Sequence, residues 1–77
     1  MNNAKAIQDF LEYRNLVGEA ERLNRLVGKL LTSEPGSRPC RIARTRRHVA
    51  EEKSFDFFTM NRCSIQHGKQ ILEGLTR

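Results

Sequence analysis

A chain of 77 residues with 38% hydrophobic residues is expected to form one small folded domain, 1–77, rather than a disordered tail. No apolar run approaches the roughly 20 residues of a membrane-spanning helix, and the first residues lack the apolar stretch of a secretory signal. The two cysteines, Cys40 and Cys63, are too few for a disulfide-built secreted scaffold, so we expect reduced thiols and a cytoplasmic location.

The formal net charge of +5 comes entirely from one short segment. Basic and acidic side chains cancel in residues 1–34, and they cancel again in residues 51–77. Five arginines, with no acidic residue between them, carry the excess: Arg38, Arg41, Arg44, Arg46 and Arg47. Because a guanidinium group binds phosphate oxygens bidentately and stacks on bases, this arginine segment predicts contact with a polyanionic partner.

Residues 4–32 have the periodicity of one long amphipathic helix. Apolar side chains recur at spacings of four, three, four and three, as in the seam of a coiled coil or a helical bundle. The members of this stripe are Leu16, Ala20, Leu23, Val27 and Leu30. The stripe offers more apolar surface than the rest of a short chain can cover, so we predict that it binds a second copy or a larger protein.

Asn24 lies inside the stripe, where it either fixes the register of a helix pair or reaches water at the edge.

The middle of the chain is harder to assign. Pro35, Gly36 and Pro39 indicate a linker over 33–39. Residues 40–50 are compatible with a strand or a helix, whereas residues 54–60 alternate like an aromatic strand. We favour a basic β-hairpin or extended segment over 40–60. Its aromatic residues are interpreted as core rather than as a stacking platform: Phe55, Phe57 and Phe58.

A second helix is predicted over 64–75. Ser64 can cap its first turn, and Ile65, Gly68, Leu72 and Leu75 follow a three-four-three rhythm. The expected fold is therefore helix-rich α+β, with a long N-terminal amphipathic helix, a basic hairpin and a C-terminal helix.

Four residues keep a structural zinc site under consideration, namely Cys40, His48, Cys63 and His67. Cys63 and His67 are one helical turn apart, but the set lacks the CxxC spacing of zinc modules. Buried thiols and ordinary histidines are the preferred interpretation, so we expect no cofactor.

No glycine-rich phosphate loop, paired carboxylates or serine–histidine constellation is present in the sequence, and we expect a binding protein rather than an enzyme. The leading hypothesis is a small accessory regulator. It would bind nucleic acid, or a nucleic-acid-processing machine such as the transcription apparatus, through the arginine segment. The alternative is an inhibitor or adaptor that docks its apolar helix face on a larger, acidic protein.

Overall fold

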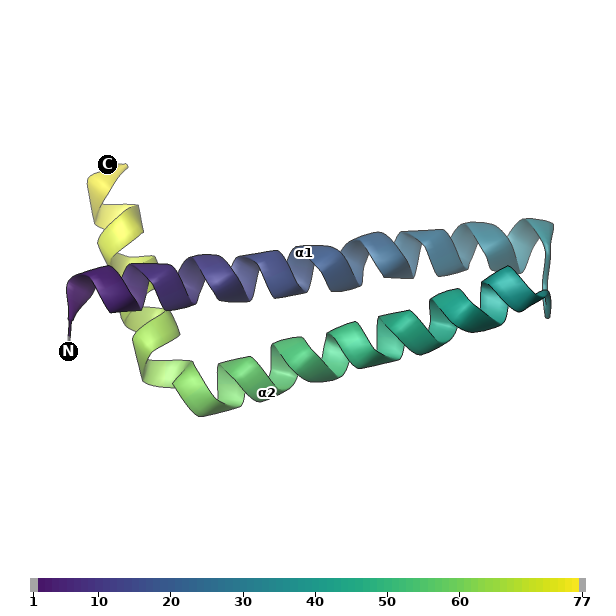
Figure 1. Ribbon diagram of the computed structural model, residues 1–77. Helices are drawn as coiled ribbons and strands as arrows, with labels where there is room; N and C mark the ends of the chain where they lie inside the picture. Colours follow the sequence, from purple (N-terminus) through teal and green to yellow (C-terminus); the bar gives the residue numbers. More distant parts are fainter. Residues whose placement is uncertain (1, 77) are drawn as a thin grey trace.

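The computed structural model describes residues 2–76, which form two long helices joined by a tight turn (Figure 1). Helix α1 spans Asn3–Ser33 and helix α2 spans Arg38–Leu75. The two run antiparallel and form a thin, elongated hairpin of 47 × 26 × 12 Å. In the described part of the chain, neither helix combines the length and the apolar character needed to cross a membrane.

Helix α1 contains the whole predicted range 4–32. It begins after Asn2, whose side chain accepts hydrogen bonds from the backbone N–H groups of Ala4 and Lys5 and so satisfies two otherwise unpaired donors. It ends at Glu34, the residue before Pro35, where the proline ring disfavours helical backbone.

The turn between the helices occupies residues 34–37. Gly36 has a φ of 77°, a left-handed conformation that glycine adopts without steric cost. Ser37 then caps α2, because its Oγ accepts a hydrogen bond of 3.3 Å from the Cys40 N–H. Pro39 lies in the first turn of α2, where its missing N–H would have had no partner and its fixed φ suits the helix.

The predicted β-hairpin over 40–60 is wrong, and with it the α+β class. This stretch is continuous helix, and no strand occurs between residues 2 and 76. Two features favour the helix. Ser37 caps its first turn, in which Pro39 lies. Side-chain pairs at i,i+4 then join Arg47 to Glu51 and His48 to Glu52. The aromatic residues point to different sides of the helix rather than alternating across a strand. Phe58 packs on Tyr13 of α1 with ring centroids 5.2 Å apart, whereas Phe55 is 69% exposed and is not part of the core.

Helix α2 bends at Asn61, whose φ of −125° and ψ of 25° are not helical. The Asn61 Nδ2 group donates a hydrogen bond to the carbonyl oxygen of Phe57, so this backbone acceptor has a partner at the bend. Beyond the bend, residues 62–75 form a C-terminal arm that crosses the N-terminal part of α1 (Figure 1). Ser64, predicted to cap a separate helix, lies inside α2 and contacts α1 instead.

The core of the hairpin is small and consists mainly of alanine. Its buried hydrophobic residues are Ala6, Ala20, Val27, Cys40, Ala43, Ala50 and Ile65. Small side chains let the two helices approach closely, but they remove little apolar surface from water. At the arm, the backbone of Gly68 lies so close to Ala6 that no side chain would fit between them.

Candidate anion-binding site

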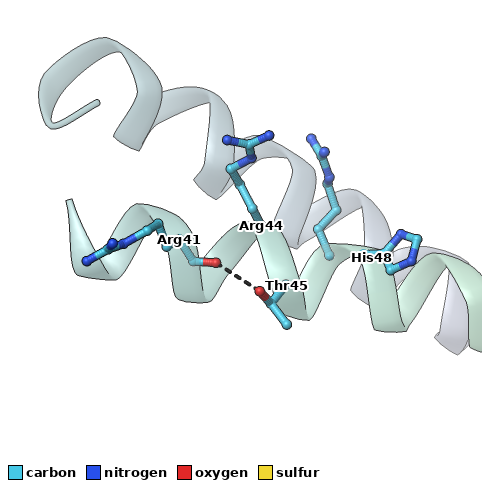
Figure 2. Close-up of a pocket in the computed structure, with 5 residues that line it drawn as sticks. Arg41, Arg44, Thr45 and His48 are labelled. Atoms are coloured by element: carbon cyan, nitrogen blue, oxygen red, sulfur yellow. Dashed lines mark hydrogen bonds between the residues drawn. The ribbon is translucent and has the colours of Figure 1, made fainter. Parts of the chain in front are cut away.

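The arginine segment forms the first three turns of α2, next to the turn of the hairpin. Arg38, Arg41, Arg44 and Arg46 are exposed, and Arg47 is half-buried against α1. In Figure 2 the side chains of Arg41 and Arg44 extend from α2 in different directions, with His48 one turn further along the helix. The Thr45 hydroxyl donates to the Arg41 carbonyl oxygen at 3.1 Å, so this hydroxyl is satisfied within the helix.

Arg47 differs from the other four because the chain itself holds it in place. One of its terminal nitrogens donates to Asn24 Oδ1 of α1 at 3.3 Å, and its Nε lies 3.8 Å from a carboxylate oxygen of Glu51. Asn24 is exposed at the edge of the helix interface and also contacts the facing helix. Of the two interpretations of Asn24, the structure supports the exposed edge position, where its side chain accepts a hydrogen bond from Arg47.

The four exposed arginines have no ion pair or side-chain hydrogen bond with any residue that the structure describes. Arg38 and Arg41 also lie at the start of α2, where the helix dipole places partial positive charge. No acidic residue occupies the first turn of α2 to offset this charge. The local field is therefore strongly positive, and a bound anion would relieve the mutual repulsion.

The exposed arginines are distributed widely around the helix. At about 100° per residue, Arg44, Arg41, Arg38 and Arg46 span an arc of about 200° of the α2 surface. Two shallow hollows separate them: Arg41, Arg44, Thr45, Arg47 and His48 line one, and Arg38, Arg41, Ile42, Thr45 and Arg46 line the other. The end of the hairpin can therefore meet anionic groups on more than one side.

The four residues considered for zinc are not brought together. Cys40 is buried near the turn, and His48 pairs with Glu52 at 3.0 Å on the surface of α2. Cys63 and His67 lie in the arm beyond the bend, where His67 contacts Asn3; the helix rises about 22 Å between His48 and Cys63. Among residues 2–76, no group of three or more His, Cys, Asp or Glu side chains could hold a metal ion.

The stripe predicted as a partner interface faces α2 of the same chain. Ala20 and Val27 are buried between the helices, and Leu16, Leu23 and Leu30 are half-buried beside them. Large apolar side chains are exposed elsewhere, including Leu26, Ile42 and Val49, each 43–44% exposed.

Asp9 was not singled out from the sequence, although it is the most buried charged side chain that the structure describes. Its Oδ2 accepts hydrogen bonds from Ser64 at 2.7 Å and Lys5 at 3.2 Å. The Ser64 hydroxyl lowers the pKa of Asp9 most, burial acts in the opposite direction, and Lys5 lowers it further. The signal was available, since Asp9 occupies the same heptad position as Leu16, Leu23 and Leu30.

Comparison of the chain with protein-family models, with curated proteins and with solved structures gives no significant match.

Proposed function

We propose that this chain is a small accessory regulator that binds nucleic acid through the arginine segment at the turn end of the hairpin, and that it performs no catalysis. The observation that supports this most directly is the set of four exposed arginines without counter-charge in the first three turns of α2. Each can neutralise a phosphate and release the counterions condensed there, which is the main source of affinity in sequence-independent binding.

The distribution of the arginines around α2 favours nucleic acid over an acidic protein. A flat acidic surface would meet charges on one side of the helix only. A nucleic-acid groove presents phosphates along both of its edges, and a helix can enter the major groove of duplex DNA. An arc of about 200° of exposed arginines suits a ligand with phosphates on both sides of the helix. The rest of the hairpin serves as a rigid support, with Arg47 anchored to α1 through Asn24.

The test is the salt dependence of binding to a short duplex DNA and to an RNA of the same length. The logarithm of the binding constant should fall with the logarithm of salt concentration, and replacing Arg41 and Arg44 by alanine should reduce the slope by up to about 0.9 per arginine. Both positions are exposed, so the substitutions leave the helix interface intact.

The matched control replaces Arg22 and Arg25 of α1, which are also exposed, and removes the same net charge. This control should change the slope far less than the α2 variant. Equal effects of the two variants would mean that net charge alone drives binding, and the site assignment would then fail. Absence of binding to either polymer at low salt would overturn the proposal and favour an acidic protein as the partner.

A further inference from the structure

One face of the hairpin has a groove between α1 and α2 that nothing in the described chain covers. Between the turn and the bend at Asn61 the hairpin is a single layer of two helices, because the arm crosses only the N-terminal part of α1. Stable domains pack at least two layers around a core, and here the single layer buries mainly alanine. The groove is lined by Glu19 and Leu23 of α1 and by Thr45, Arg46, Val49, Ala50 and Lys53 of α2.

The floor of this groove is apolar, and the apolar surface continues beyond it. Val49 and Leu23 lie in the groove itself. Leu26 follows Leu23 by one turn on α1, and Ile42 precedes Val49 by two turns on α2, so each extends the same flank of its helix. Leu26, Ile42 and Val49 are each 43–44% exposed. We name this surface, together with Glu19, Arg46 and Lys53, the groove face.

The charges on the groove face are opposite on its two sides. The α1 side carries Glu19, and the α2 side carries Arg46 and Lys53. None of the three forms an ion pair within the part of the chain that the structure describes. A surface with one sign of charge on each flank is complementary to a copy of itself after a suitable two-fold rotation.

We propose that the groove face binds the groove face of a second copy of this chain, so that the two hairpins stack face to face with their turns at the same end. A two-fold axis parallel to the helices places α1 of each copy over α2 of the other. Each residue keeps its position along the helix direction, so the two turns lie at the same end. Glu19 of each copy then lies opposite Arg46 and Lys53 of the other, and the leucines of α1 meet Ile42 and Val49.

The alternative two-fold axis, perpendicular to the helices, gives a less favourable arrangement. It places α1 over α1 and α2 over α2, with the turns at opposite ends. Arg46 and Lys53 then face the same basic flank of the other copy, and Glu19 faces α1 of the other copy, which contributes no basic residue to the groove face. Like charges in apposition cost free energy, so the arrangement with both turns at one end is selected.

This dimer would bring Arg38, Arg41 and Arg44 of both copies to the same end, while Arg46 lies in the interface opposite Glu19 of the other copy; only this consequence rests on the proposed function. A single polyanion could bridge both segments. Binding of the polyanion and dimerisation would then strengthen one another.

Sedimentation equilibrium of the full chain without nucleic acid tests the dimer, independently of any binding assay. Near physiological salt, we expect a mass of twice 8.9 kDa at micromolar concentrations. Glu19→Lys and Lys53→Glu should each weaken the dimer at least about tenfold, because each places like charges in contact. The double variant, Glu19→Lys with Lys53→Glu, should restore most of the affinity. Helicity measured by circular dichroism should stay unchanged in all three.

A monomer at every concentration, or a dimer that none of these substitutions weakens, would overturn the interface. The orientation has its own test, in which a spin label is attached at Glu34→Cys in the turn, with Cys63 replaced by serine and Cys40 buried. Turns at the same end predict a label-to-label distance well below half the 47 Å length of the molecule. A distance near that full length would establish the opposite orientation and overturn the proposed one.

Discussion

Ser64 Oγ donates a hydrogen bond of 2.7 Å to Asp9 Oδ2, and this bond joins the C-terminal arm to α1 across 55 positions of the chain. Both side chains lie close to the crossing of Gly68 over Ala6. The polar bond and the close backbone contact together fix where the arm crosses α1. A buried carboxylate specifies this position more sharply than apolar packing can, because it loses its partner if the arm shifts.

The docking of the arm should depend on pH. The pKa of Asp9 is lowered, chiefly by the Ser64 hydroxyl, below its ordinary value of 3.8. The charged carboxylate therefore favours the folded state. Its contribution is complete above the ordinary pKa and is lost as the pH falls through the lower pKa of the folded protein. Ser64→Ala should lower the Tm by a few degrees at pH 7 and flatten the dependence of Tm on pH below pH 4. An unchanged acid dependence in this variant would show that other carboxylates cause the acid transition.

Gly68→Ala should destabilise the fold because the added methyl group would overlap the Ala6 carbonyl. We expect a loss of about 1–3 kcal/mol in the free energy of unfolding, as for overpacked sites. Urea denaturation followed by circular dichroism measures it.

The matched control for Gly68 is Gly18→Ala, where an added Cβ meets no atom within 4 Å. This substitution should stabilise α1 by up to about 1 kcal/mol through helix propensity. If Gly68→Ala were as stable as the wild-type chain, the arm would not be held against Ala6 as described.

The sequence predicted α1 well because large apolar side chains mark its interface. The stripe from Leu16 to Leu30 has the spacing of a packed helix, and α1 covers the predicted range. The helix predicted over 64–75 lies within α2, but residues 40–60 were assigned to a hairpin because the interface there is marked by small residues, Cys40, Ala43 and Ala50, which contribute little to a hydrophobicity pattern. The spacing of these small residues is helical, but the arginines between them dominate the hydropathy of the segment and hide that periodicity.

The candidate site, like the fold, was predicted from the sequence only in part. The arginine segment was evident from charge counting, which does not depend on secondary structure. Its helical arrangement, and therefore the arc over which the arginines project, required knowledge of the fold. The contact of Asp9 with Ser64 joins residues far apart in sequence, and no local pattern predicts which distant partner a buried carboxylate finds.

The two thiols should react at very different rates. Cys63 is exposed in the arm, whereas Cys40 is 1% exposed between the helices near the turn. A chromogenic disulfide reagent should modify one thiol per chain rapidly and the second only when the hairpin opens. Cys63→Ser should abolish the rapid phase and leave the slow one. Rapid reaction of both thiols would show that the turn end of the hairpin opens readily.

The arginine segment should reduce the stability of the free protein. Arg38 and Arg41 lie in the first turns of α2, where the helix dipole disfavours positive charge, and no acidic residue in the first turn offsets them. Replacing both by glutamine should raise stability at low salt by about 0.3–1 kcal/mol per site. The gain should disappear near 1 M salt, where the screening length falls to about 3 Å. The same substitutions at Arg22 and Arg25 should give little gain, because both lie inside α1, away from the helix ends where the dipole acts. A gain in stability accompanied by weaker polyanion binding is typical of residues kept for function at a cost to the fold. Loss of stability at low salt would instead make these arginines part of the structural framework.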